Sequence, residues 1–349
     1  MKPAAIMYLV TRTHGLKTHL ISPRDIQLLV KAKSLREVSD NLLKAEYGTE
    51  ISKLPTREVD ALTLEEIFLK ILVDRFFFIT REAQGKLQDL LTRYCGRFEV
   101  ENIKRVIRAK HGGETIEERN LLPLSREHTI VNLPALIKAK DVEDAISLLR
   151  ETPYRPLVER LETYRRAGTT MVLEAALDDI YFDKVWEITG KISNGNGVKD
   201  LVGEEIDLRN LLIALSLKIR DLPPTLIAEA LISSSYKLTV GRLRTLAQAR
   251  LEDAPDILRG TPYSGLGSEV VNLVKERSAS PLERLFLNRL YEDASASLKT
   301  RFLDAGYVVA YLLLSECEAK NLVTITTGKQ LGLGEEEILQ GLLGFQTRA

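Results

Sequence analysis

The stretch SECEAKNLVTITTGK, residues 315–329, contains the pattern that organises this chain. Asn321 stands in a helical run, with an acidic residue three positions before it, a leucine directly after it and a lysine eight positions after it. The same frame, [DE]-x-x-N-[IL]-x6-K, occurs in FEVENIKRVIRAK (98–110) around Asn102 and in EIDLRNLLIALSLK (205–218) around Asn210. The three asparagines are 108 and 111 residues apart, which predicts a threefold internal repeat.

A second marker has nearly the same period. Three segments begin with L-x-x-A-[KR] and end in a tyrosine that lies five positions after a leucine. They are LVKAKSLREVSDNLLKAEY (29–47), LIKAKDVEDAISLLRETPY (136–154) and LAQARLEDAPDILRGTPY (246–263). Because turn-forming residues cluster at 111–123 and 220–226, we place the three similar domains at 1–112, 113–222 and 223–349. Units of this length are too long for ordinary solenoid repeats, so each is expected to be a small domain.

The apolar residues recur with helical spacing almost everywhere, and alternating strand-like runs are rare. Ser34 and Asp141 each precede such a run, with an acidic residue three positions later, which is typical of a helix N-cap. Long amphipathic helices are predicted over 169–192 and 280–306. The sequence therefore predicts an all-α protein.

The composition excludes several classes of protein. The 349 residues include 49 basic and 49 acidic side chains, so a nucleic-acid partner, which usually needs a basic surplus, is not expected. The two cysteines and four histidines are scattered without metal-ligand spacing, and so few cysteines fit a reducing cytosol. No segment reaches the roughly 18–20 apolar residues of a membrane span, and the first residues lack the features of a signal peptide, so a soluble protein is expected.

The Gly328-Lys329 pair suggests a phosphate-binding loop, but its surroundings do not fit one. In a P-loop a serine or threonine follows the lysine, and a further glycine stands five positions before the second glycine. Here Gln330 follows the lysine, and position 323 is valine. No nucleotide or other cofactor is expected at this place.

Asp178, Asp179 and Asp183 lie together in the sequence DDIYFD, and this is the strongest sign of an enzyme. All-α terpenoid enzymes use aspartate-rich helical motifs to hold Mg²⁺ and a diphosphate, because clustered carboxylates suit hard cations. The acidic pattern LEDAPD (251–256) would be the second motif. Neither pattern recurs as a facing pair in the other repeats, so a diphosphate-binding enzyme is kept only as an alternative, beside a generic helical scaffold. We nominate no catalytic, cofactor-binding or metal-ligating residue.

The frame itself has a structural interpretation. Glu99, Asn102 and Lys110 lie along one side of a helix, and asparagine is unfavourable inside a helix. A buried amide without a partner costs about 1–3 kcal/mol. An asparagine that occurs three times in the same frame is therefore predicted to tether its helix to the same partner in each copy. Binding of another protein at the domain rims is the alternative.

The three frames, the opening YLVTRTHGLKTHLISPRDIQLLVKAKSLREVSDNLLKAEY and the segment YLLLSECEAKNLVTITTGKQLGLGEEEIL together resemble the C subunit of archaeal-type rotary ATP synthases. That family is homologous to the d subunit of the eukaryotic vacuolar ATPase. The resemblance extends over essentially the whole chain, in order. It rests on helix-packing residues, so it identifies the fold more directly than any single contact.

The resemblance implies a funnel of three similar helical domains around a pseudo-threefold axis, with a central cavity. It also implies a non-catalytic socket, meaning a protein that receives the end of the central rotor shaft and sits on the membrane-embedded proteolipid ring. Such a protein lies on the cytoplasmic face of the membrane, peripherally and in one copy per complex. There it transmits torque between ATP turnover and the transport of protons or sodium ions.

Overall fold

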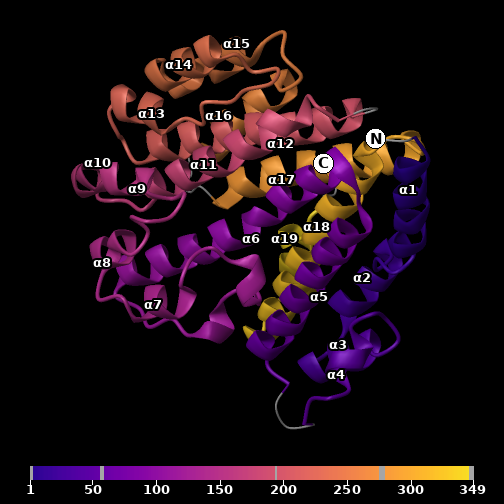
Figure 1. Cartoon of the computed structure of the whole chain (residues 1–349). Helices are drawn as coiled ribbons and strands as arrows, with labels where there is room; N and C mark the ends of the chain where they lie inside the picture. The colour runs from indigo at the N-terminus through magenta and orange to yellow at the C-terminus, as the bar shows by residue number, and fades with distance from the viewer. Residues whose placement is uncertain (1–2, 56–58, 193–194, 275–279, 346–349) are drawn as a thin grey trace. The chain divides into compact units, whose positions relative to one another are not determined.

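The computed structural model describes residues 3–55, 59–192, 195–274 and 280–345 (Figure 1). Over these ranges the regular elements are all helices and no strand is formed, which confirms the predicted all-α class. Within the same ranges, no helix is both long enough and apolar enough to cross a lipid bilayer.

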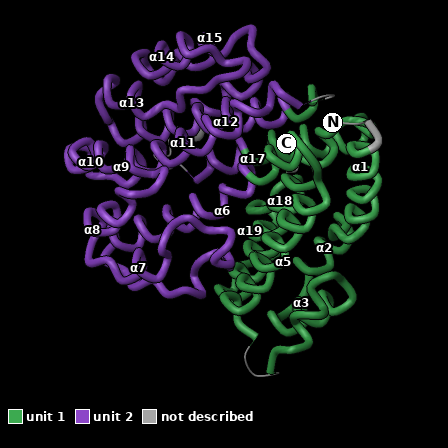
Figure 2. The backbone as a smooth tube through the Cα atoms, in the orientation of Figure 1, with its two compact units in different colours: residues 1–92, 193–198, 287–349 green, residues 93–192, 199–286 purple. Residues whose placement is uncertain are grey.

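The helices belong to two compact units, one formed by residues 1–92, 193–198 and 287–349 and the other by residues 93–192 and 199–286 (Figure 2). Unit 1 contains α1 (Pro3–Lys17), α2 (Pro23–Lys31), α3 (Leu35–Leu42), α4 (Gly48–Ile51), α5 (Ala61–Glu82), α18 (Gly306–Gln330) and α19 (Glu335–Gly341). Unit 2 contains α7 (Leu133–Lys138), α8 (Val142–Ser147), α9 (Pro156–Glu159), α10 (Leu161–Ala167), α11 (Met171–Thr189), α13 (Pro224–Ala230), α14 (Val240–Gln248), α15 (Ala254–Leu258) and α16 (Gly267–Val274), with four short 3₁₀ helices (Glu118–Asn120, Arg126–His128, Leu251–Asp253 and Ser264–Leu266). The division between the units falls within α6 (Gly85–Gly112), α12 (Asn196–Ile219) and α17 (Ser280–Thr300).

The core of unit 1 forms where α5 and α18 pack against the short helices α2, α3, α4 and α19. Leu64 and Phe68 of α5 and Leu322 of α18 are fully buried in it. Burying a side chain of this size contributes about 1.5–3 kcal/mol, so this cluster accounts for much of the stability of the unit. The C-terminal helix α18 is therefore in the same core as residues from the first fifth of the chain.

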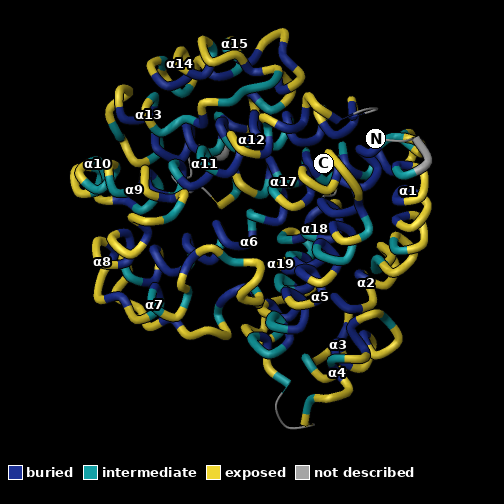
Figure 3. The backbone as a smooth tube through the Cα atoms, in the orientation of Figure 1, coloured by how far each residue is buried: buried dark blue, intermediate teal, exposed yellow. Residues whose placement is uncertain are grey.

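The long helices of unit 2 are α11 and the 93–112 and 199–219 parts of α6 and α12, and they are buried over much of their length. Exposed residues are concentrated in the short helices α7–α10 and α13–α16 and in the segments that connect the helices (Figure 3). Some of the short helices, such as α7, α8 and α14, begin at capping side chains. Asp141 accepts a hydrogen bond from the Asp144 amide at 2.9 Å, and in unit 1 Ser34 accepts one from the Glu37 amide at 3.2 Å. The two predicted N-caps are thus confirmed.

One predicted helix is shorter than expected. The run 280–306 forms α17 only as far as Thr300, and a new helix, α18, begins at Gly306. Asp304 lies between them and accepts a hydrogen bond from the Gly306 amide at 2.6 Å. A side chain that satisfies the first free amides of the next helix favours a break at this place.

Candidate functional site

Each of the three frame asparagines is buried and holds the backbone of a segment 20 or 22 residues further along the chain. In every copy the amide oxygen accepts a backbone N–H at 2.8 Å and the amide nitrogen donates back to a carbonyl of the same residue, at 2.9, 3.4 and 3.1 Å in chain order. The pairs are Asn102 with Leu122, Asn210 with Ile232, and Asn321 with Leu343. The predicted tether, with the same kind of partner in each copy, is confirmed.

The acidic residue three positions before each asparagine accepts a hydrogen bond from the tyrosine that ends a marker segment. The O–O distances are 2.6 Å for Glu99 with Tyr154, 2.9 Å for Asp207 with Tyr263, and 2.7 Å for Glu318 with Tyr47. Each carboxylate also accepts at least one backbone N–H from residues just before α7, α14 or α2. The donors are Ile130 and Val131 for Glu99, Tyr236 to Leu238 for Asp207, and Ile21 for Glu318. The two sequence markers are therefore the two halves of one buried contact.

The tyrosine hydroxyl remains the hydrogen-bond donor in this contact. Burial, together with the neighbouring Glu99 carboxylate, raises the pKa of Tyr154 far above the ordinary value for tyrosine. Burial and Glu318 likewise raise the pKa of Tyr47. A neutral hydroxyl that faces an acceptor is a stable arrangement over the whole physiological pH range.

These contacts define three anchor modules, each made of a frame helix and its marker segment. Module A joins α6 to residues 113–154, and module B joins α12 to residues 220–263, both in unit 2. Module C, in unit 1, joins α18 and the chain that follows it to residues 21–47 at the other end of the sequence. A repeat period alone does not indicate that the third copy is completed by the N-terminal segment.

The frame lysines repeat only in part. Lys110 donates to the Ile137 carbonyl at 2.7 Å, and Lys218 donates to the Ala247 and Ala249 carbonyls at 2.9 and 2.6 Å. Lys110 thus binds a carbonyl near the end of α7, and Lys218 binds carbonyls at the end of α14. Burial lowers the pKa of Lys218. Lys329 makes no equivalent bond to the residues that the structure describes.

Module C has a different additional contact. The Arg75 side chain, buried on α5, donates to Glu318 at 2.9 Å and to Glu46 at 2.7 Å. Glu46 directly precedes the marker tyrosine Tyr47, so the arginine joins both halves of the module. Sequence reasoning missed this residue, because it occurs in one copy only and follows an apolar run.

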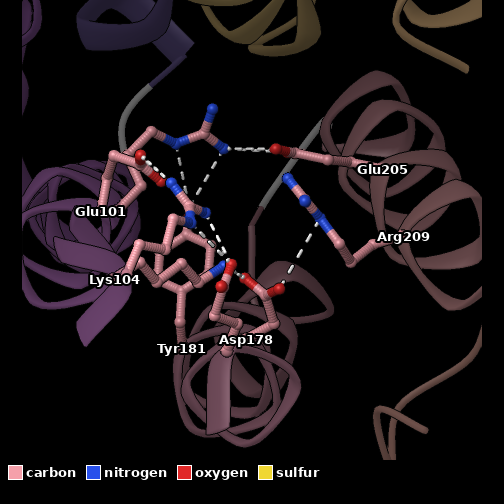
Figure 4. Close-up of polar contacts among 9 residues, drawn as sticks. Glu101, Lys104, Asp178, Tyr181, Glu205 and Arg209 are labelled. Carbon is pink, nitrogen blue, oxygen red and sulfur yellow. Dashed lines mark hydrogen bonds and ion pairs between the residues drawn. The ribbon is translucent and has the colours of Figure 1, made fainter. Parts of the chain in front are cut away.

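A second group of polar contacts joins α6, α11 and α12 inside unit 2, and we call it the three-helix junction (Figure 4). At one level Lys104 of α6 donates to Asp178 of α11 at 2.5 Å, and Arg209 of α12 approaches the same carboxylate at 3.8 Å. Lys104 and Asp178 are almost fully buried. One carboxylate is thus shared by cations from the two neighbouring helices.

At the second level of the junction the residues come from the same three helices. Arg97 of α6 donates to both carboxylate oxygens of Glu205 on α12, at 2.7 and 2.9 Å, and to the hydroxyl of Tyr181 on α11 at 3.1 Å. The guanidinium also lies over the Tyr94 ring, 3.8 Å from its centroid. The sequence pattern singles out Asp178 but does not reveal its partners.

The predicted acidic motif is not assembled as an ion-binding site. Asp178 belongs to the junction, Asp179 accepts from the Ser233 amide and hydroxyl at 2.7 and 2.8 Å, and Asp183 is exposed. In LEDAPD, Asp253 accepts from the Arg250 amide and Asp256 pairs with Arg259 on the surface. Within the described ranges, no group of three His, Cys, Asp or Glu side chains is arranged to hold a metal ion.

Comparisons with known proteins find relatives that match nearly the whole chain. The C subunit of the A-type ATP synthase of Methanocaldococcus jannaschii is 26% identical over 349 residues, which covers 98% of this chain and 87% of that protein. The protein of the same name from Haloquadratum walsbyi is 27% identical over 340 residues, covering 95% of this chain and 96% of its own length. For the one from Haloferax volcanii the identity is 26% over 341 residues, with 95% of each chain covered. The family model described as ATP synthase (C/AC39) subunit matches residues 9–341, and the chain therefore belongs to that family.

Proposed function

We propose that this protein, as a subunit of a rotary ATP synthase, is the non-catalytic socket of the central stalk. In this role it receives the end of the rotor shaft, sits on the membrane proteolipid ring and transmits torque between them. The observation that carries the proposal is the family match over residues 9–341, which leaves only short ends of the chain outside it. The buried anchors give the family match a physical meaning, because a part that transmits torque must hold its helices in fixed positions.

The structure supports this role through the composition of the anchors. Each module is closed in the interior by an asparagine that bonds to the backbone of a following segment, and by a carboxylate that accepts from a tyrosine hydroxyl. Satisfied buried polar contacts of this kind restrict the relative positions of the segments more than apolar contacts do, because hydrogen bonds are directional. Three such modules are well suited to a rigid adaptor.

The location follows from the same proposal. We place the protein peripherally on the cytoplasmic face of the membrane, in one copy per complex, with the proteolipid ring and the shaft subunits as partners. The balanced charge agrees with protein partners rather than nucleic acid. The domain limits 1–112, 113–222 and 223–349, and their arrangement as a funnel around a pseudo-threefold axis, stay part of the proposal.

The test is a pull-down of the tagged protein from membranes of the source cells, solubilised gently enough to keep the ATPase intact. Recovery of a small proteolipid together with shaft and catalytic subunits is the expected result. Recovery of the protein alone, while another tagged subunit recovers the intact complex, would refute the socket and leave a generic helical scaffold. No observation favours the diphosphate-binding enzyme, since Asp178 and Asp179 are both engaged in contacts within the protein.

A further inference from the structure

The three-helix junction of unit 2 contains buried charges within an otherwise mainly apolar interior. Lys104 and Asp178 are 5% and 8% exposed, and Arg97 and Glu205 are each 11% exposed. Removing charges from water costs several kcal/mol per ion, and replacing a buried pair by apolar residues of similar volume is often neutral or stabilising. Net stability is therefore a poor explanation for these residues, and their geometry must be considered.

The geometry gives each helix two separate points of attachment. The two residues of α6, Arg97 and Lys104, are seven positions apart, or about 10 Å along the helix axis. The two residues of α12, Glu205 and Arg209, are four positions apart, or about 6 Å. Since each level contacts all three helices, sliding or rotating one helix breaks bonds at both levels (Figure 4).

Directional bonds make this arrangement different from the apolar core around it. Apolar contacts are non-directional, so a helix can shift slightly and exchange one contact for another at little cost. In contrast, one nitrogen of the Arg97 guanidinium donates to both oxygens of Glu205, and the Lys104 ammonium donates to one oxygen of Asp178. Charge-assisted bonds of this kind are the strongest and most geometrically specific hydrogen bonds in proteins.

We propose that the three-helix junction is a positioning device, which fixes the register of α6, α11 and α12 and keeps unit 2 rigid under torque. Its register-fixing part rests only on the geometry of unit 2. Its load-bearing part rests on the proposed function as a torque-transmitting subunit. The two parts can be tested separately.

A matched control lies on the same helix pair. Arg108 of α6 pairs with Glu174 of α11 at 2.6 Å, but the arginine side chain is 47% exposed. The Glu174 carboxylate is 17% exposed, so this pair is less buried than either level of the junction and is expected to contribute less. The control variant Arg108→Met/Glu174→Leu therefore removes one ion pair between α6 and α11 without touching the two buried levels.

The first experiment compares amide hydrogen exchange in the full-length chain. The variant Lys104→Met/Asp178→Leu/Arg209→Met should keep or raise the melting temperature, while exchange in α11 and in the 199–219 part of α12 becomes about tenfold faster. The control variant should leave exchange in these helices as in the wild type. Unchanged exchange in the triple variant would overturn the proposal. A large loss of melting temperature with faster exchange throughout unit 2 would also overturn it, because that pattern shows that the junction stabilises the fold rather than fixing the register.

If the triple variant does not fold, Asp178→Asn gives the same test with the shape of the side chain kept. This variant should increase amide hydrogen exchange in α11 and α12, since a neutral amide cannot hold both cations. Exchange at the wild-type rate would contradict the proposal.

The load-bearing part is measured in the assembled ATP synthase, as the number of ions transported per ATP hydrolysed. A fall in this ratio with the triple variant but not with the control is expected. Faster exchange without a change in the ratio would refute load bearing alone, whereas failure of the wild-type chain to enter the complex would refute the proposed function.

Discussion

Replacing Asn210 by leucine tests whether the frame asparagines hold the fold together. The amide oxygen of Asn210 accepts from the Ile232 amide at 2.8 Å, and its nitrogen donates to the Ser234 and Ile232 carbonyls at 3.2 and 3.4 Å. Both Asn210 and Ile232 are buried, so water cannot replace the lost partner. A buried N–H group without an acceptor costs about 1–3 kcal/mol.

Two smaller effects modify that cost. Leucine is a better helix former than asparagine by several tenths of a kcal/mol, which reduces the loss. The wider branch of leucine must fit where a planar amide lay in contact with the backbone, which increases it. The net expectation is a loss of about 2–3 kcal/mol, or roughly 4–12 °C in melting temperature for a unit of this size.

The assay is thermal and urea unfolding of the variant beside Asn102→Leu and a control, Asn41→Leu. Asn102 bonds to both backbone groups of Leu122 at 2.8 and 2.9 Å, so its replacement should be at least as costly. Asn41 is exposed on α3, and its replacement should change stability by less than about 0.5 kcal/mol. Melting temperatures of Asn210→Leu and Asn102→Leu within a degree or so of the control would refute the tether.

Three further expectations concern the other residues of the anchors. Tyr263→Phe removes one of the four groups that donate to Asp207 and should cost about 1.5–3 kcal/mol in urea unfolding, whereas the same change at the half-exposed Tyr164 should cost less. Burial lowers the pKa of Lys218 in the folded state below its unfolded value, so the unfolded chain binds more protons between the two values. The wild type should therefore gain stability relative to Lys218→Met as the pH rises from 8 toward 10. A stability difference that stays constant with pH would contradict this. Glu318→Gln leaves Glu46 as the carboxylate that pairs with the buried Arg75, so it should cost about 1.5–3 kcal/mol, and limited proteolysis should cut residues 21–47 before unit 2. Cleavage in unit 2 first would count against module C as a separate contact.

The repeat and the all-α class could be predicted from the sequence because both depend on local spacing. A helical period and a recurrent asparagine are visible within windows of about 15 residues, and an asparagine at a helical, apolar position requires a partner whatever the fold. The role of the asparagine as a tether followed from that requirement alone. Its partner, the backbone of the segment that follows, is equally local.

The contacts between the two markers could not be predicted in the same way. Glu99 and Tyr154 are 55 residues apart, and Glu318 and Tyr47 are 271 apart, so nothing in a local window connects them. The period shows that each marker occurs three times, but it does not show which copies meet. Asp178 was misleading for a related reason, because its neighbours in sequence are acidic while the cations that hold it lie on two other helices.

Module C is closed by opposite ends of the chain, and it is the module to which Arg75 adds a buried ion pair. In modules A and B the tyrosine follows its carboxylate by 55 and 56 residues, whereas in module C the separation is 271 residues. If the intervening chain is treated as one flexible loop, this difference increases the entropic cost of closure by about 1.4 kcal/mol. A hydrogen bond to a charged group contributes about 1.5–3 kcal/mol, and Arg75 makes such bonds to Glu318 and to Glu46. Removing one partner of a buried ion pair is costly even where the pair itself adds little net stability, so Arg75 makes separation of the two distant ends of module C more costly.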